Sequence, residues 1–411
     1  MRARWLGLAA VAAIAPGAAG CGATGVSGAS EAAGSQLAVY SSLPLQGSTG
    51  LSSQQIVNGE KLALAEAGGR AGPFKVGYVS LDDSNLKSGQ WDPGVTATNA
   101  KTAAEDTSTI AYLGDLNSAA TAVSLPLMNA GGILQISTAS PYVGLTSSLD
   151  AGQDEPERFY PTGQRTFARL QPGDPAQAAA QVQLMQSLGV HRLYVLDNQD
   201  PFAGPLAAIV AGDAAGAGIT VAAHDSLSVT AGTVFTGEIE RIMASHAQAV
   251  FFAGGGGAGA VALWKQLHSA DPHLLLLGSS AMVEEPFTSE IAAAGASTYL
   301  TTPVLPAAAY PHSAQHVLAD YRKAFGEEGG PDALYGYEAM TLVLDAIRSG
   351  GVRGNDRQVV IERVFATRNR DSVIGRYSIE PDGETTLSRF AVDRVLAGRP
   401  VLYRVMDTKG G

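Results

Sequence analysis

The feature that most constrains the fold is an alternation between short apolar runs and helix-like segments, which recurs along most of the chain. In the first half, apolar runs such as LAVYSSLP, TIAYLGDL and ILQIS alternate with segments of helical spacing such as LSSQQIVNGEKLALAEAGG. Apolar strands between helices indicate a parallel sheet, because helices cover both faces of such a sheet. The alternation therefore predicts an α/β fold built from βαβ units.

The alternation stops between Thr138 and Gln171 and then resumes with strand-like runs such as RLYVLDN, AVFFAG and HLLLLGSS. A chain of 411 residues is long enough for two domains of ordinary size. We therefore expect two doubly wound parallel-sheet units. Ligands of open parallel sheets bind beyond the carboxyl ends of the strands, so the expected site lies between the two units.

The N-terminus predicts export. The stretch MRARWLGLAAVAAIAPGAAGC has a basic start, a short apolar run and small residues before Cys21. This pattern is typical of a secretory signal, and its end resembles a bacterial lipobox. We expect a lipoprotein signal peptide over residues 1–21, lipidation of Cys21 and a Gly/Ala/Ser-rich flexible tether over residues 22–36. An ordinary signal peptide, with Cys21 incidental, is the alternative.

These features predict a location outside the cytoplasm, with the protein either lipid-anchored to the outer face of the cytoplasmic membrane or in the periplasm. Cys21 is the only cysteine, so neither an intrachain disulfide nor a cysteine-based zinc site is expected. The formal net charge is −11, and no run of Lys and Arg forms a basic stripe. Nucleic-acid binding is therefore not expected.

Residues that could support catalysis are present, but they form no convincing constellation. His312 and His316 have i,i+4 spacing without a third metal ligand nearby in the sequence, and no G-x-S-x-G motif occurs. Asp82 and Asp83 are interpreted as a strand end and turn cap in preference to an acid–base pair. We expect no enzymatic activity, no metal and no cofactor.

A glycine run in VFFAGGGGAGAVALWK raises the alternative of a dinucleotide site. Gly254, Gly256 and Gly259 match G-x-G-x-x-G between a strand and a helix. A dinucleotide site also needs an acidic residue at the end of the next strand, which here reads LLLLGSS. The missing acid argues against a nicotinamide cofactor.

Four segments, taken in order and spacing, carry a family resemblance. They are SSLPLQGSTG with NGEKLALAEAGG, YVSLDDS, YLGDLNSAATAVSLPLMNAGGILQIS and ALYGYEAMTLVLDAI. The chain resembles branched-chain amino-acid ABC transporter substrate-binding proteins of the Leu/Ile/Val type. The resemblance implies a type I periplasmic binding protein fold with a three-segment hinge. The implied lobes are residues 37–170 plus 301–389 and residues 171–300 plus 390–411.

The same resemblance implies a monomer that binds a small molecule between its lobes and delivers it to an ABC permease in the membrane. A sensory or regulatory lipoprotein of the same fold is the alternative function. By position, Ser118 beside Asn117 would hold a ligand carboxylate at a helix start, where free amides and partial positive charge favour anions. The carbonyl of Ala139 and the nearby Ser140 would meet the ligand from the same lobe, and Phe202 would cover it from the other.

Three positions depart from the family pattern. Ser280 stands where relatives commonly have an acid, Gly255 lies nearest to a missing aromatic residue, and Ser52 aligns with another. Without an acid, a ligand ammonium would lie unpaired in a closed cleft, at a cost of several kcal/mol. Glu284 or Glu285 could supply the acid, but both are interpreted in preference as acids that compensate the dipole at the start of the next helix. We therefore expect a roomier pocket for a carboxylate-bearing or aromatic molecule, an amide or a peptide fragment.

Overall fold

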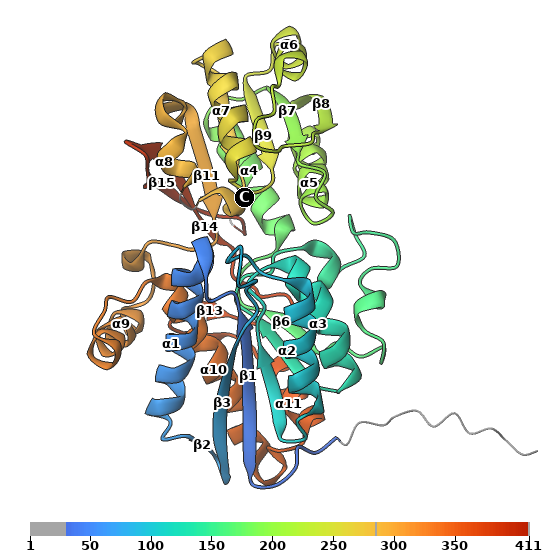
Figure 1. The fold of residues 1–411 in the computed structure, drawn as a ribbon, viewed down its shortest axis with the longest axis vertical. Helices are drawn as coiled ribbons and strands as arrows, with labels where there is room; N and C mark the ends of the chain where they lie inside the picture. The colour runs from blue at the N-terminus through green and yellow to red at the C-terminus, as the bar shows by residue number, and fades with distance from the viewer. Residues whose placement is uncertain (1–29, 284–285, 410–411) are drawn as a thin grey trace, which may run out of the picture.

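The protein consists of two α/β lobes arranged along its long axis, each built on its own sheet (Figure 1). The computed structural model describes residues 30–283 and 286–409. The predicted signal peptide, Cys21, most of the predicted tether and the alternative acids Glu284 and Glu285 lie outside the described residues. The α/β fold with two mixed, largely parallel sheets confirms the predicted fold class.

Lobe 1 contains a six-stranded sheet with the order β2-β3-β1-β4-β5-β6. Its parallel strands are β1 (Gln36–Leu43), β3 (Phe74–Asp82), β4 (Thr109–Leu113), β5 (Leu134–Ser137) and β6 (Phe167–Arg169), and the short β2 (Arg70–Ala71) is antiparallel. The helices of this lobe are α1 (Gly50–Glu66), α2 (Pro93–Glu105), α3 (Ser118–Ala130), α9 (His312–Phe325), α10 (Pro331–Gly350) and α11 (Arg357–Phe365). A small hairpin of β12 (Arg370–Ser372) and β13 (Gly375–Tyr377) joins them.

Lobe 2 contains a seven-stranded sheet with the order β15-β14-β11-β10-β9-β7-β8. Its parallel strands are β7 (Arg192–Asp197), β8 (Thr220–Ser226), β9 (Ala249–Ala253), β10 (Leu275–Gly278) and β11 (Thr298–Thr302). The last two strands, β14 (Arg389–Leu396) and β15 (Arg399–Asp407), are antiparallel. The helices are α4 (Asp174–Ser187), α5 (Ala203–Gly216), α6 (Thr236–Ala244), α7 (Ala258–Ala270) and α8 (Phe287–Glu290).

The central strands are largely apolar and buried because helices cover both faces of each sheet. Every residue of β4 and of β9 is buried. In lobe 1, glycine brings α1 and α10 close together. A Cβ atom at Gly59 would lie 2.1 Å from the carbonyl oxygen of Ala333, and one at Gly336 would lie 2.1 Å from that of Ile56. Any larger residue at either position would push the two helices apart.

The chain passes between the two sheets three times. The first crossover follows Arg169 and leads into α4, the second follows Thr302, and the third precedes Arg389. Because β6 and β11 end at crossovers, their carboxyl ends lie at the boundary between the lobes. The strands parallel to them in each sheet end at the same edge, which brings the loops after these strands together.

Residues 30–35, at the end of the predicted tether, pack against lobe 1. The amide of Ala32 donates to the carbonyl of Asn355 over 2.7 Å, and the amide of Arg357 donates to the carbonyl of Ser30 over 2.7 Å. Ala32 is buried in the core of the lobe. The described chain therefore begins at the end of lobe 1 that lies away from lobe 2 (Figure 1). Among the residues described, no helix is both long and apolar enough to cross a membrane.

Candidate ligand site between the lobes

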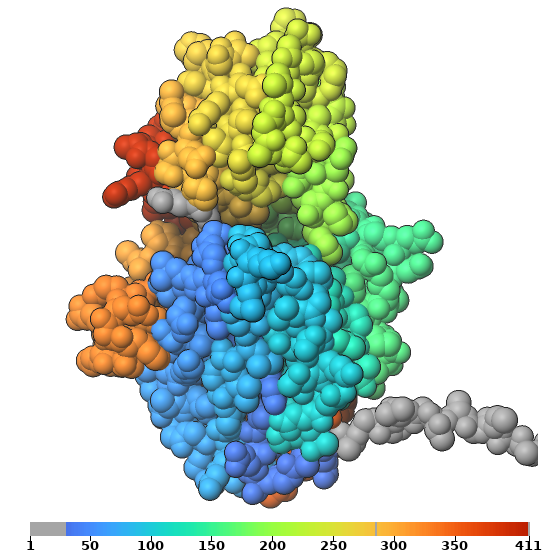
Figure 2. All heavy atoms as spheres, viewed as in Figure 1, coloured from blue at the N-terminus to red at the C-terminus, as the bar shows by residue number. Residues whose placement is uncertain are grey.

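The surface is indented where the two lobes meet (Figure 2). On the lobe 1 side, α3 begins at this boundary directly after β4. Asn117 is the N-cap of α3, and its side-chain oxygen accepts a hydrogen bond from the amide of Ala120 over 2.8 Å. The amides of Ser118 and Ala119 have no acceptor among residues 30–283 and 286–409. Two free amides at a helix start form a site that favours an anion.

The hydroxyl of Ser118 is oriented by the backbone. The amide of Tyr142 donates to the Ser118 Oγ over 3.1 Å, and Ser118 itself is 8% exposed. A serine hydroxyl has one hydrogen to donate and two lone pairs to accept with. Since one lone pair accepts from Tyr142 and no described residue accepts the hydroxyl hydrogen, that hydrogen is left to donate to a ligand oxygen.

Residues 138–147, here called the Ser140 loop, lie beside Ser118. The hydroxyl of Ser140 lies 2.7 Å from that of Thr121 and 3.2 Å from the carbonyl oxygen of Asp115, and Ser140 is buried. Its hydroxyl is therefore engaged inside lobe 1. Ala139 is partly exposed, and its carbonyl has no donor among the described residues. Of the two predicted ligand contacts in this loop, Ala139 is thus the one with a free polar group.

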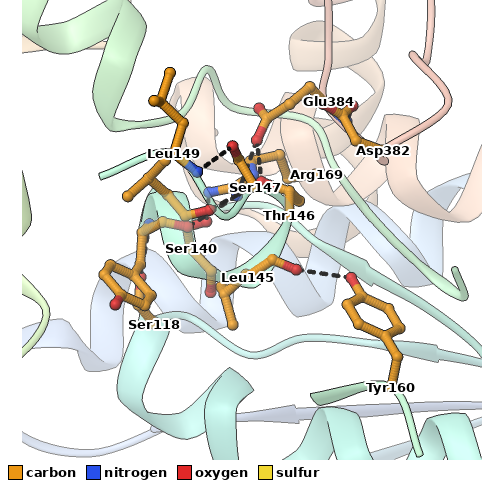
Figure 3. Close-up of polar contacts among 12 residues, drawn as sticks. Ser118, Ser140, Leu145, Thr146, Ser147, Leu149, Tyr160, Arg169, Asp382 and Glu384 are labelled. Carbon is orange, nitrogen blue, oxygen red and sulfur yellow. Dashed lines mark hydrogen bonds and ion pairs between the residues drawn. The ribbon is translucent and has the colours of Figure 1, made fainter. Parts of the chain in front are cut away.

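A buried arginine holds the Ser140 loop from behind (Figure 3). Arg169, the last residue of β6, is fully buried and donates to the carbonyl oxygens of Ser140 and Tyr142 and to the Thr146 hydroxyl. It also pairs with Glu384 over 2.9 Å. These contacts fix the backbone that carries Tyr142, and hence the amide that orients Ser118.

On the lobe 2 side, Phe202 reaches the Ser140 loop. Phe202 is the N-cap residue of α5, and its amide donates to the Asp200 carboxylate over 2.8 Å. Its partly exposed ring meets the Tyr142 ring edge to face, with centroids 5.0 Å apart and an interplanar angle of 86°. Because Tyr142 belongs to lobe 1, this aromatic pair bridges the lobes.

The acids at the strand ends of lobe 2 already have partners. The carboxylate of Asp197 accepts hydrogen bonds from the amide of Gln199 and, over 2.7 Å, from the Ser226 hydroxyl. It also lies 2.9 Å from the His224 Nε2. The carboxylate of Asp200 caps α5. Ser280 is partly exposed after β10, and its amide donates to Gln177 over 3.0 Å. Lobe 2 therefore offers a ligand ammonium no uncommitted carboxylate from the described strand ends.

The glycine run lies between β9 and α7, and its members differ in their surroundings. A Cβ atom at Gly254 would lie 2.6 Å from the Phe252 ring, and one at Gly256 would lie 2.7 Å from the Phe287 Cβ. At Gly255 and Gly257 a Cβ atom would meet nothing within 4 Å. The first two glycines are required by packing, and the other two leave open space at the lobe boundary.

Buried acids lie beneath the site in lobe 1. Burial raises the pKa of Asp115 to about 7, partly offset by a hydrogen bond from Ser124. Burial and the neighbouring charge of Asp82 raise the pKa of Asp83 to about 7. Asp82 itself accepts from the amides of Leu45 and Ser84, so it caps the loops after β1 and β3. The two acids adjacent in sequence therefore have different roles.

Other residues considered in the sequence lie away from this boundary or form no site. His312 and His316 are exposed on α9, with ring centroids 4.9 Å apart. No group of three or more His, Cys, Asp or Glu side chains that could hold a metal occurs in the part of the chain that the structure describes. Sequence reasoning placed Tyr142 in a loop after a strand end but gave it no contact role, and it did not single out Arg169. A single arginine among the apolar residues of FARL, just before the break in the alternation, was the available signal.

Two α/β lobes joined by three crossovers, with a free helix start at their boundary, define the class of two-lobed solute-binding proteins. The chain belongs to the periplasmic binding protein family, whose sequence model matches residues 41–399. Members of this family bind solutes outside the cytoplasm and catalyse no reaction. Membership of this family confirms the predictions of a non-enzymatic protein and of an extracytoplasmic location.

Solved structures share the fold at low sequence identity. A leucine-binding protein, LivK, from Thermotoga maritima has a TM-score of 0.73 and 19% identity, covering 90% of this chain and 99% of its own. The branched-chain amino acid transporter substrate-binding protein LivJ from Streptococcus pneumoniae, solved with isoleucine, has a TM-score of 0.69 and 15% identity, covering 90% and 99%. A solute-binding protein from R. palustris, solved with benzoate, has a TM-score of 0.68 and 14% identity, covering 90% and 96%. No curated protein matches the sequence significantly.

Proposed function

We propose that this protein is the solute-binding component of an ABC importer and that it takes a small carboxylate between its lobes. The observation that carries the proposal is the donor set at the start of α3. The Ser118 hydroxyl hydrogen and the amides of Ser118 and Ala119 are free of acceptors among the described residues. A carboxylate would complete these hydrogen bonds and favour the positive end of the helix dipole.

The ligand class follows from what lobe 2 presents. Asp197 and Asp200 are committed to other partners, and Ser280 carries no charge. An ammonium buried here would lack a counter-charge from these positions, which is costly in a closed cleft. Open space at Gly255 and the rings of Phe202 and Tyr142 suit a flat apolar body. A benzoate-like acid therefore fits better than leucine, isoleucine or valine, and a solved structure of this fold with benzoate bound supports this choice.

Closure of the lobes would bury the ligand and present the closed form to a permease. The three crossovers provide a hinge, and the Phe202–Tyr142 contact lies at the boundary that such a motion would tighten. In this proposal the folded body works outside the cytoplasm as a monomer, attached to the membrane through the lipidated Cys21. The genes beside this one bear on the transport role: permease and ATPase genes support it, and a receptor gene in their place favours a sensory role.

The ligand class is tested by thermal-shift and calorimetric titration of protein that has been unfolded and refolded to remove any bound solute. The probes are benzoate, leucine, isoleucine and valine at equal concentrations. A ligand present at a hundred times its Kd stabilises the folded state by about 2.7 kcal/mol. We expect benzoate to raise the midpoint of unfolding and the three amino acids to leave it unchanged. Micromolar or tighter binding of leucine would overturn the proposed ligand class.

A further inference from the structure

Arg169 occupies an unusual position for an arginine, because it is fully buried at the last residue of β6, where the first crossover begins. Its guanidinium group takes part in four interactions, three with the Ser140 loop and one with Glu384. The planar guanidinium presents several donors in a fixed fork, so one side chain can hold several acceptors at set angles.

Two of these interactions reach the backbone of the Ser140 loop. Nη1 donates to the carbonyl oxygen of Ser140, and Nη2 donates to that of Tyr142 over 2.9 Å. These carbonyls lie in the Ser140–Pro141 and Tyr142–Val143 peptide planes, so Arg169 holds the backbone on both sides of the Pro141–Tyr142 plane, which carries the Tyr142 amide. The amide of Tyr142 then points at the Ser118 Oγ, 3.1 Å away. Arg169 thus acts on the Ser118 hydroxyl through the backbone of Tyr142.

The ion pair with Glu384 ties the same group to the segment before the third crossover. Arg169 pairs with Glu384 over 2.9 Å, and the Thr146 hydroxyl donates to the same Glu384 oxygen over 2.6 Å. The backbone amide of Arg169 donates to the carbonyl of Gly383 over 3.0 Å. Figure 3 shows Arg169 between the loop that carries Ser140 and Thr146 and the segment that carries Glu384.

Lobe 2 is joined to the same loop at the start of α4. The amide of Asp174 donates to the carbonyl of Pro141 over 2.8 Å. A Cβ atom at Gly173 would lie 3.2 Å from a Glu384 carboxylate oxygen and 3.2 Å from the Pro141 carbonyl oxygen, so the crossover is packed tightly against this cluster. The Ser140 loop is therefore in contact with two crossovers and with the proposed ligand donor.

We propose that Arg169 is a positioning residue for the ligand site, which holds the Ser140 loop to the first and third crossovers and thereby aims the Ser118 hydroxyl. This inference rests on the proposed binding function at Ser118. A role in stability alone is the simpler reading, but a buried ion pair by itself contributes little net stability compared with apolar packing. A positioning role and a stability role differ in what they predict for the hydrogen exchange of the Tyr142 amide and for ligand affinity.

The test compares Arg169→Lys and the milder Thr146→Val with a matched control, Arg370→Lys. Arg370 is largely buried in lobe 1 and pairs with Glu338 over 2.6 Å, joining β12 to α10 without touching the Ser140 loop. A lysine at either position keeps the charge but lacks the rigid planar fork that holds several acceptors at set angles. Hydrogen exchange is measured on the ligand-free proteins, and benzoate affinity is measured by calorimetry.

In the ligand-free proteins, we expect the Tyr142 amide to exchange at least about tenfold faster in Arg169→Lys than in wild type, with a smaller increase in Thr146→Val. Arg370→Lys should leave that amide unchanged even if it lowers global stability. Benzoate affinity should fall about tenfold in Arg169→Lys and stay within about twofold in Arg370→Lys. If Arg169→Lys does not fold, Thr146→Val carries the exchange comparison.

Unchanged protection of the Tyr142 amide in Arg169→Lys, or in Thr146→Val where that variant carries the test, would overturn the positioning role. Since exchange is measured without ligand, this result is independent of ligand class. If wild type binds no benzoate while Arg169→Lys still releases the Tyr142 amide, the proposed ligand class fails and the positioning of the loop stands. Equal loss of benzoate affinity in Arg169→Lys and Arg370→Lys would reduce Arg169 to a stability role.

Discussion

The amide nitrogen of Tyr142 lies 3.1 Å from the hydroxyl oxygen of Ser118, although 24 positions separate the two residues. This contact joins the start of α3 to the loop after β5. It determines which way the Ser118 hydroxyl can donate, because the lone pair facing Tyr142 is occupied. The same Tyr142 meets Phe202 of the other lobe through its ring.

Replacing Ser118 by alanine removes a donor from the proposed carboxylate site. We expect Ser118→Ala to weaken benzoate binding by about 1–3 kcal/mol, since a buried polar group of the ligand then lacks its partner. Calorimetry provides the affinity, and Ser313→Ala on the exposed start of α9 is the control. An unchanged affinity in Ser118→Ala would remove this residue from the site.

Truncating Phe202 removes the aromatic bridge between the lobes. We expect Phe202→Ala to lower benzoate affinity while leaving the fold intact, since Phe202 is only partly buried. An edge-to-face pair contributes about 0.5–1.5 kcal/mol beyond the area it buries. Tyr403→Ala breaks a similar pair with Tyr299, 5.4 Å between centroids, within lobe 2 and is the matched control. Equal affinities in the two variants would argue against a covering role for Phe202.

Within the glycine run, Gly256 is tightly packed and Gly255 faces open space. We expect Gly256→Ala to lower the free energy of unfolding by about 1–3 kcal/mol, because its Cβ would lie 2.7 Å from the Phe287 Cβ. Gly255→Ala should leave stability unchanged, since no atom lies within 4 Å of the added carbon. Urea unfolding measures both.

A second substitution at Gly255 concerns the ligand. Gly255→Tyr fills the open space, so we expect it to weaken benzoate binding while the protein stays folded. If Gly255→Tyr binds benzoate as tightly as wild type, the ligand does not use that space. Gly257→Ala, also free of close neighbours, shows whether a small side chain elsewhere in the run is neutral.

Asp82 and Asp83 should affect stability with opposite dependence on pH. Folding raises the pKa of Asp83 from 3.8 to about 7, chiefly through burial and then through the charge of Asp82. The folded state therefore favours the protonated form, and its stability falls as pH rises from about 4 to about 7. Asp83→Asn should remove this loss, so its stability relative to wild type should be higher at pH 8 than at pH 5.

The pKa of Asp82 is lowered instead, because hydrogen bonds from Ser84, Gln46 and Leu45 outweigh the effect of burial. Its stabilising contribution is present above the unfolded pKa and is lost as pH falls through the folded one. Asp82→Asn should therefore cost more stability at pH 6 than at pH 3. Urea unfolding across this range measures both variants, and parallel profiles for the two would contradict the assignment.

The arrangement of strands and helices could be predicted from the sequence because the apolar alternation is a local signal. The start of α3 at Ser118 could also be placed, since a strand, a turn and an N-cap follow one another there. The strand ends then indicated which loops meet at the lobe boundary. These inferences depend only on residues close together in the sequence and on the rule that the carboxyl ends of parallel strands lie at the same edge of a sheet.

The remaining features depend on contacts between distant residues. Nothing near Arg169 in the sequence indicates that its partner is Glu384, and the engagement of Ser140 with Thr121 appears only after folding. The sequence alone could not show which glycines of the run are tightly packed, because Gly256 packs against Phe287, which is distant in the sequence. Residues 30–35 read as tether by composition, but the core position of Ala32 comes from its bond to Asn355.

The three crossovers also bear on how the chain can reach its folded state during synthesis. Lobe 1 needs α9, α10 and α11, and the sheet of lobe 2 is completed only by β14 and β15 near the C-terminus. Until β14 arrives, β11 would be an unpaired edge of the lobe 2 sheet, and an unpaired strand edge is prone to association. Neither lobe can therefore complete its fold before almost the whole chain has been made.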